Sequence, residues 1–280
     1  MKEINAVHNG SFDSLESIKV SPLSRAYTFS DSVYEVIPFL GDNIIAFERH
    51  IKRLINSSAA LKISINEEVV KNEIKKLINA CKIENGYVYY QISRGVDSIR
   101  SHIYKDNLSA ETFGYIVKHN FKDQTLKVML CEDIRWSRCD IKSTSLLGNI
   151  MLMNNAKEQD CNEVVMHKNN IITEGGASNI FFSIEERICT PELSKDILPG
   201  ITRELLIDLI KNDGMTLEEG KYTINDLKKA DSVWLTSSTK PLAEVTQISN
   251  LEVNLKKDHH LFRRCNKLFR DKYINEKSVQ

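Results

Sequence analysis

Hydrophobic positions in the first third of the chain recur with helical spacing in two stretches. Phe47, Ile51, Leu54 and Ile55 stand at i, i+4, i+7 and i+8, which is typical of an amphipathic helix. A second set follows Ser64 and Asn66, residue types that begin helices, and consists of Val70, Ile74, Leu77, Ile78 and Cys81. We therefore expect two helices, each packed by one face.

Strand patterns surround these helices. Residues 87–93 and 113–117 are rich in aromatic and β-branched side chains, and the pair Asn9-Gly10 favours a tight hairpin turn. The polar stretch 118–123 then breaks the pattern. It predicts a boundary between a small N-terminal domain, 1–120, and a larger C-terminal domain, 121–280.

The second part of the chain alternates strands and helices. Strands are expected at 126–131, on both sides of Asn169-Asn170 and at 232–236. The apolar positions that predict helices are Leu205, Leu206, Leu209 and Ile210, with an end near Gly214, and later Leu261, Cys265, Leu268 and Phe269. This order predicts two α/β domains, the smaller one first.

Composition limits the classes of function. The chain has 280 residues, with 38 Lys and Arg balancing 38 Asp and Glu, so a strongly basic nucleic-acid binder is disfavoured. No apolar run is long enough to cross a membrane, and the first residues do not resemble a signal peptide, so we expect a cytoplasmic protein. The six cysteines form no CxxC pair, which favours free thiols and no metal site.

One lysine lies in a chemically suggestive segment. Lys142 follows Asp140 and Ile141, near two arginines. Neighbouring cations and partial burial lower the pKa of a lysine and make it nucleophilic, as Schiff-base chemistry requires. A solvated surface lysine is the alternative, because lysine is seldom buried unless paired.

Three other segments carry candidate ligand contacts. Glu174, followed by small residues, could bond a ligand that the backbone approaches closely. Gly200, Ile201 and Thr202 precede a predicted helix, where free amides attract anions. The hydroxyl cluster 236–239 ends a predicted strand. Taken singly, these segments are better explained as a turn, a helix start and a loop, respectively.

Taken together, these segments resemble the fold-type IV aminotransferases, which depend on pyridoxal phosphate (PLP), and within them the bacterial D-amino-acid aminotransferases. The resemblance runs over nearly the whole chain. Six blocks carry it in order, at 25–35, 50–54, 90–95, 134–143, 173–175 and 200–203. It implies a two-domain α+β or α/β fold, a small and a large domain with the cofactor at their interface.

The resemblance also implies roles for individual residues. Lys142 is similar to the Schiff-base lysine, and Glu174 to the acid that keeps the pyridine nitrogen protonated. Tyr34 resembles a tyrosine of the substrate site whose hydroxyl bonds the substrate carboxylate or the lysine. The residues that resemble phosphate contacts are Arg53, on the polar side of its predicted helix, with Ile201, Thr202, Ser238 and Thr239.

Substrate choice depends on the carboxylate clamp. Arg100 and His102 match the Arg-x-His pair with which D-amino-acid aminotransferases hold the substrate carboxylate, from a loop that reaches over from the partner subunit. The resemblance therefore implies a homodimer acting on D-alanine, D-glutamate or D-aspartate, with 2-oxoglutarate or pyruvate as acceptor. The loop 96–100 is one residue longer than the family pattern and lacks its proline, a change that favours a wider substrate range.

Several alternatives share the fold. A branched-chain L-amino-acid aminotransferase, an (R)-amine transaminase and an aminodeoxychorismate lyase would use the same cofactor chemistry. A non-catalytic binding protein of this fold would be expected to lack Lys142 or Glu174, and both are present.

Overall fold

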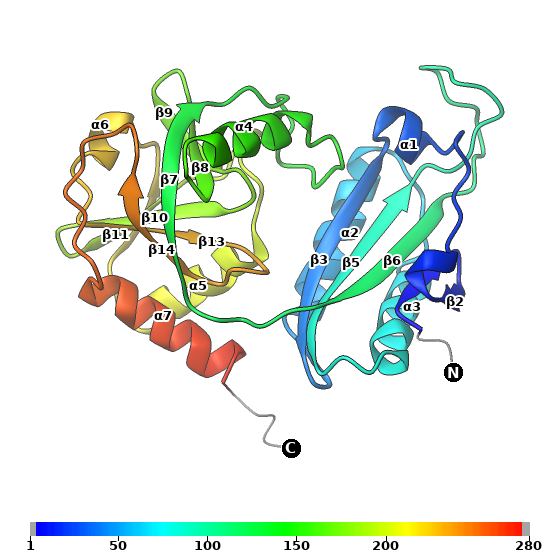
Figure 1. Ribbon diagram of the computed structural model, residues 1–280, viewed down its shortest axis with the longest axis horizontal. Coiled ribbons are helices and arrows are strands. Elements are labelled where there is room, and N and C mark those ends of the chain that lie inside the picture. Colours follow the sequence, from blue (N-terminus) through cyan, green and yellow to red (C-terminus); the bar gives the residue numbers. More distant parts are fainter. Residues whose placement is uncertain (1–3, 276–280) are drawn as a thin grey trace. The chain divides into compact units, whose positions relative to one another are not determined.

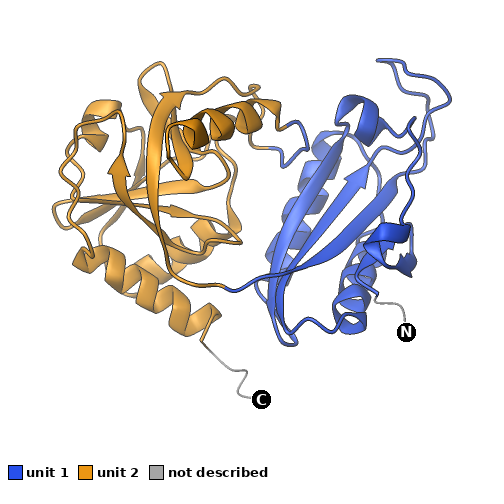
Figure 2. Cartoon of the chain, in the orientation of Figure 1, with its two compact units in different colours: residues 1–120, 141–145 blue, residues 121–140, 146–280 orange. Residues whose placement is uncertain are grey.

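The computed structural model describes residues 4–275, which form two compact units (Figure 2). Of the described residues, the first unit comprises 4–120 together with Ile141–Ser145, and the second comprises 121–140 and 146–275. The chain thus enters the second unit after Asn120, returns to the first for five residues, and leaves it again. The sequence-based division at 120 did not anticipate this return, which carries Lys142.

The first unit is built on one antiparallel sheet with the strand order β2-β1-β6-β5-β3-β4. Helices α2 and α3 lie on one face of it (Figure 1). The strands are β1 (Ala6–His8), β2 (Ser11–Asp13), β3 (Ser32–Leu40), β4 (Asn43–Ile44), β5 (Asn85–Ser93) and β6 (Glu111–Lys118). The helices are α1 (Arg25–Phe29), α2 (Phe47–Ala60) and α3 (Glu67–Ala80), and a short 3-10 turn spans Leu15–Ser17.

The two helices expected from apolar spacing are α2 and α3. Ile51 and Leu54 of α2 and Ile74 of α3 are fully buried in one cluster with the sheet. Asn66 caps α3, because its side chain accepts hydrogen bonds from the amides of Glu68 and Val69. The hairpin at Asn9-Gly10 is also present, since His8 pairs with Ser11.

The second unit contains an eight-stranded mixed sheet with the order β12-β11-β10-β13-β14-β7-β8-β9. The strands are β7 (Gln124–Glu132), β8 (Glu163–Lys168), β9 (Ile171–Gly175), β10 (Asn179–Ile184), β11 (Arg187–Pro191), β12 (Leu217–Gly220), β13 (Ser232–Thr236) and β14 (Ala243–Ile248). The helices are α4 (Leu147–Glu158), α5 (Ile201–Asn212), α6 (Ile224–Leu227) and α7 (His260–Tyr273).

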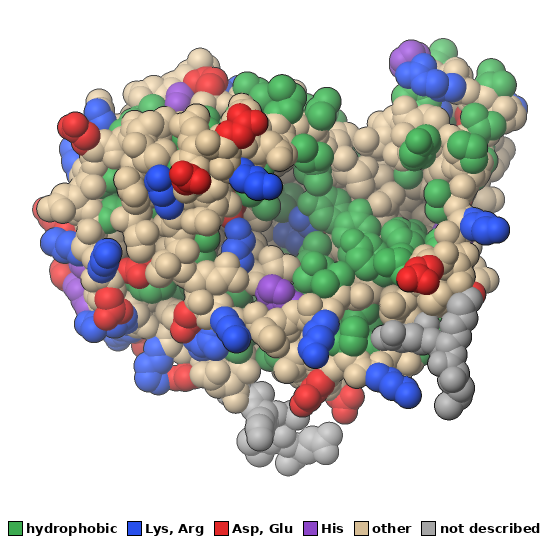
Figure 3. Space-filling view, in the orientation of Figure 1, with side chains coloured by type: hydrophobic (Ala, Val, Ile, Leu, Met, Phe, Trp, Pro, Cys, Tyr) green, Lys and Arg blue, Asp and Glu red, His purple; other side chains and the backbone are tan. Residues whose placement is uncertain are grey.

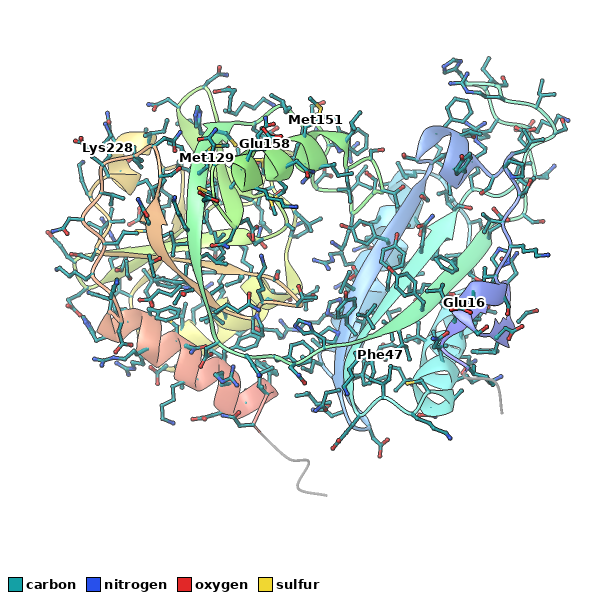
Figure 4. The ribbon with its side chains drawn as sticks, viewed as in Figure 1. Glu16, Phe47, Met129, Met151, Glu158 and Lys228 are labelled. Atoms are coloured by element: carbon teal, nitrogen blue, oxygen red, sulfur yellow. The ribbon has the colours of Figure 1, made fainter. Side chains whose placement is uncertain are left out.

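Helix α4 was not expected from the sequence. Leu152 and Ala156 pack with Met129 of β7, whereas Leu147 and Met151 of the same helix are 70% and 51% exposed (Figure 4). The apolar residues of this helix are therefore spread over buried and exposed positions, and the sequence shows no single apolar face. Within residues 4–275, the structure contains no helix of the length and apolar character that crossing a membrane requires.

Candidate active site

The backbone of Lys142 is fixed by its return to the first unit. The amide of Tyr34 in β3 donates to the Lys142 carbonyl at 3.0 Å, and the Lys142 amide donates to the Ser57 hydroxyl of α2 at 3.2 Å. Val33 and Ser143 form an antiparallel bridge. The segment 141–145 therefore runs along β3 as a short addition to the sheet of the first unit.

The side chain of Lys142 meets the ring of Tyr34. Its Nζ lies 4.2 Å from the ring centroid, so the contact is with the ring face rather than the hydroxyl. Tyr34 stacks on Tyr89 at 5.5 Å, and Tyr89 lies 5.2 Å from Tyr115. This aromatic row crosses β3, β5 and β6, where Figure 3 shows hydrophobic side chains gathered. The side chain of Lys142 therefore lies at one end of a row of three tyrosine rings.

Arg53 is held by a buried carboxylate. The sequence suggested the polar side of a helix, yet Arg53 is only 8% exposed and donates twice to Glu35, at 2.7 and 2.8 Å. His50 contacts the same carboxyl group at 2.8 Å. Burial raises the pKa of Glu35, but the charge and hydrogen bonds of Arg53, helped by His50, outweigh it and hold the pKa well below the usual range. Arg53 is thus fixed in orientation as a cation.

Arg100 and His102 lie in the loop between β5 and β6, and both are exposed. The guanidinium carbon of Arg100 is 4.6 Å from the centroid of the Phe29 ring, and the His102 ring centroid is 5.4 Å from that same ring. One aromatic ring therefore gathers the two side chains of the predicted clamp.

In the second unit, Glu174 of β9 is 4% exposed and surrounded by donors. Arg135 donates to Oε1 at 2.5 Å, while the Asn179 amide group and the Leu198 backbone amide donate to Oε2 at 3.0 and 3.1 Å. Burial is the largest influence and raises the pKa of Glu174 to about 7, because Arg135 opposes it only in part and Asp133 adds a negative charge. This carboxyl group therefore changes its protonation state near neutral pH.

Asn179 links Glu174 to the other predicted cofactor contacts. Its Nδ2 also donates to the Leu198 carbonyl at 2.9 Å, and a Cβ at Gly200 would come within 1.9 Å of its Oδ1, so only glycine fits there. Gly200 is the N-cap of α5, whose first residues are Ile201 and Thr202.

Asn179 also pairs with Thr236, and the turn that follows Thr236 carries Ser238 and Thr239. Asn179 thus bonds Glu174 and the segment just before α5, and its strand pairs with the residue that precedes the Ser238–Thr239 turn. Gly200 provides no side-chain cap, so the first amides of α5 present the positive end of the helix dipole.

Comparison with known proteins identifies the family. The family model for amino-transferase class IV matches residues 32–248, most of the chain. The chain belongs to the class IV aminotransferases. It is 33% identical over 246 residues to the D-alanine aminotransferase of Listeria monocytogenes serotype 1/2a (strain 10403S), covering 85% of each chain. It is 30% identical over 279 residues to the D-alanine aminotransferase of Staphylococcus epidermidis (strain ATCC 35984), covering 97% of this chain and 98% of the relative.

Solved structures share the fold of this class IV aminotransferase. The branched-chain amino acid aminotransferase of Escherichia coli superposes with a TM-score of 0.91 over 100% of this chain and 97% of its own, at 19% identity. A T.th. branched-chain enzyme complexed with N-(5'-phosphopyridoxyl)-L-glutamate has a TM-score of 0.84, at 22% identity, over 96% and 93% of the two chains. The predicted two-domain fold and the fold-type IV resemblance are confirmed.

Class IV aminotransferases depend on PLP, and the residues present fit that cofactor. A lysine amine can hold its aldehyde, and a carboxyl group with a raised pKa can share a proton with its ring nitrogen. The helix start at Ile201 and the hydroxyls near Ser238 are donors suited to a phosphate.

Sequence reasoning missed the residues that hold Glu174 and Arg53 in place. Arg135 and Asn179 lie inside segments singled out from the sequence, yet neither received a role. Glu35 stands beside Tyr34 in its motif and also went unremarked. Their partners are 39, 5 and 18 residues away, respectively. Glu35 offered a signal, because a charged residue within the apolar run 33–37 indicates a buried pair. Arg135 stands in a stretch of charged and polar residues, 132–140, and gave no such signal.

Proposed function

We propose that this class IV aminotransferase transfers the amino group of D-amino acids, of the D-alanine, D-glutamate and D-aspartate type, to a 2-oxo acid such as 2-oxoglutarate or pyruvate. The observation that carries the proposal is the pair Arg100 and His102 gathered on Phe29. A guanidinium beside an imidazole is a selective partner for a carboxylate. The names of the relatives at 30% and 33% identity support the same substrate class.

Lys142 would carry the proton transfer, beside the ring of Tyr34. When bound, PLP supplies an aldehyde that bonds to an amine and a ring that accepts electrons from the substrate Cα. Nζ of Lys142 would hold the cofactor and, once the substrate amine has replaced it, accept the proton from the substrate Cα. The ring face of Tyr34, 4.2 Å from Nζ, would limit the positions that the lysine side chain can take.

Glu174 would hold a proton at the ring nitrogen. A pKa near 7 suits a group that shares a proton with a pyridine, and a nearby pyridinium charge would favour its carboxylate form. Arg53, Ile201, Thr202, Ser238 and Thr239 would bind the phosphate through one cation, helix amides and hydroxyls. Two of the Arg53 N–H groups already bond Glu35, so its contribution would come from a guanidinium of fixed orientation.

A homodimer would complete the site. In the family that this chain resembles, the clamp loop serves the partner subunit. Arg100 and His102 are exposed, and so are Ile99 and Ile103, at 63% and 84%, which suits a loop covered by a second copy. Sedimentation should give a dimer at assay concentration, and a fully active monomer would refute this part of the proposal. A cytoplasmic location stays a prediction.

An enantiomer-resolved assay tests the substrate. The purified holoenzyme is offered D-alanine or L-leucine with 2-oxoglutarate, and the glutamate formed is separated on a chiral column. We expect D-glutamate from D-alanine, with kcat/KM at least ~10-fold above that for L-leucine. L-glutamate from L-leucine, with no product from D-alanine, would instead show a branched-chain aminotransferase.

A further inference from the structure

The loop that carries the clamp is tied down at its base. Its Gly95 accepts a hydrogen bond from the Arg25 amide at 2.9 Å, and Val96 forms a bridge with Ser24. Gly95 has φ +112, and a Cβ there would meet the Ser109 carbonyl oxygen at 2.0 Å, so glycine is needed for the loop to close. These contacts fix where the loop starts but leave its tip unconstrained.

A buried arginine reaches the tip. Nη1 of Arg25 donates to the carbonyl of Ser101 at 2.7 Å, and Ser101 is the residue between Arg100 and His102. Arg25 is 4% exposed, far less than a surface cation. A rigid donor therefore holds the backbone at the midpoint of the clamp.

Arg25 is itself fixed by an ion network. Its Nε donates to Asp31 at 2.9 Å, and Arg94 grips the same carboxylate through two N–H groups at 2.7 and 2.9 Å. Although burial raises the pKa of Asp31, hydrogen bonds and charge from Arg94 and Arg25 lower it below the usual value, so Asp31 is ionised at neutral pH. Arg94 also donates to the carbonyl of Leu61 at 2.7 Å, so the ion network is connected to the backbone just after α2.

Phe29 completes the arrangement, because three side chains share its ring. The guanidinium carbons of Arg25 and Arg100 each lie 4.6 Å from the ring centroid, and His102 lies 5.4 Å from it. Arg100 is a long, exposed side chain that would otherwise sample many rotamers. A single aromatic face limits that freedom and keeps Arg100 and His102 together.

We propose that Arg25 and Phe29 of α1 are positioning residues for the substrate carboxylate, with Arg25 holding the backbone between Arg100 and His102 and Phe29 holding their side chains. The inference rests on the proposed clamp. A prearranged clamp loses less freedom when the carboxylate arrives, so these residues govern substrate affinity more than turnover.

Phe29→Leu is the decisive variant, since it removes the ring while keeping an apolar side chain and the Arg25 network. For the holoenzyme we expect KM for D-alanine to rise about fivefold, with a smaller change in kcat. Hydrogen exchange at the amides of 100–103 should quicken, and PLP affinity should stay constant. Phe29→Tyr, which keeps the ring, should restore both values.

Two further variants serve as a control and as a stronger test of the positioning role. Phe47→Leu removes another ring that lies under a cation, Lys75 at 5.1 Å, and should leave KM unchanged. Arg25→Met should raise KM further than Phe29→Leu, because it releases the Ser101 carbonyl. If Arg25→Met fails to fold, Phe29→Leu still decides the matter.

Arg100→Ala separates this inference from the function on which it rests. It should raise KM for D-alanine about 100-fold. If Arg100→Ala has that effect but Phe29→Leu changes neither KM nor exchange, the positioning role is wrong while the clamp stands. If Arg100→Ala leaves KM unchanged, both the carboxylate clamp and the positioning role of Arg25 and Phe29 are refuted.

Discussion

Each unit buries one glutamate against an arginine, and the two carboxyl groups titrate in opposite directions. Glu35 in the first unit has a pKa well below the usual range, whereas burial raises the pKa of Glu174 in the second to about 7. Their exposures are 0% and 4%, so desolvation alone cannot separate them. The difference follows from the charged partners around each carboxyl group.

Arg53 gives two N–H groups to Glu35, and His50 adds a third contact. Arg135 instead divides its charge, with Nε and Nη2 donating to Asp133 at 2.9 and 2.7 Å and Nη1 alone reaching Glu174. Asp133 also repels the second negative charge. Glu35 therefore stays ionised because Arg53 and His50 together outweigh its burial, whereas the pKa of Glu174 is raised because Arg135 also pairs with Asp133, whose negative charge lies nearby.

The largest expected effect is on turnover. Glu174→Gln cannot hold a proton at a ring nitrogen, and its amide N–H would face donors, because Arg135, Asn179 and Leu198 all donate to this side chain. We expect the single-turnover rate with D-alanine to fall about 10³-fold, with PLP still bound. The exposed Glu186→Gln in the same unit is the control. An unchanged rate in Glu174→Gln would remove the role of this acid.

The next effect is on stability. Glu35→Gln removes the negative charge that neutralises the buried Arg53, so the free energy of unfolding should fall by about 3 kcal/mol. Glu73→Gln is a matched control, because Glu73 is also buried but accepts from the hydroxyls of Tyr90 and Thr112. Urea unfolding of the cofactor-free protein measures both. Equal losses in the two variants would contradict the distinction between charged and neutral partners.

The pH dependence of stability should show both shifts. Because the pKa of Glu174 is raised from 4.5 to about 7, its stabilising contribution is complete below pH 4.5 and lost as the pH rises to 7. Glu35, with a lowered pKa, contributes fully above pH 4.5 and less as the pH falls. In the cofactor-free protein, Glu174→Gln should remove a loss of ~3 kcal/mol between pH 4.5 and 7. Parallel unfolding curves for the two proteins would disprove the raised pKa.

The smallest expected effect is on the pKa of Glu174, and it tests whether the pairing of Arg135 with Asp133 raises that pKa. Asp133→Asn removes the competing charge and leaves Arg135 to Glu174, so the pKa of Glu174 should fall, with a proton affinity about tenfold weaker. The midpoint of the stability loss in the pH series would move toward lower pH. Asp140→Asn, which loses an ion pair with Arg138 in the same segment, should leave that midpoint in place. A midpoint unmoved by Asp133→Asn would mean that burial alone sets the pKa.

The helices that the sequence predicted are those whose apolar residues recur with helical spacing. Helices α2 and α3 show regular apolar spacing, while α4 has exposed Leu147 and Met151 opposite buried Leu152 and gives no such pattern. The site divides in the same way. Lys142 and Glu174 stand in local motifs and could be named, but Arg135 acts on a carboxyl group 39 residues away. Such pairings depend on strand order, which no local pattern encodes.

The five-residue return of the chain has a consequence for anyone who would divide or recombine this enzyme. Ile141 is 5% exposed and belongs to the hydrophobic core of the first unit. A polypeptide ending at Asn120 would therefore lack a piece of its own core, and the lysine would remain on the other fragment. Grafting the first unit onto a relative requires three junctions, after residue 120, before 141 and after 145, because residues 141–145 must be transferred as a separate insert. Selection for a filled core and selection for the lysine thus act on the same five residues.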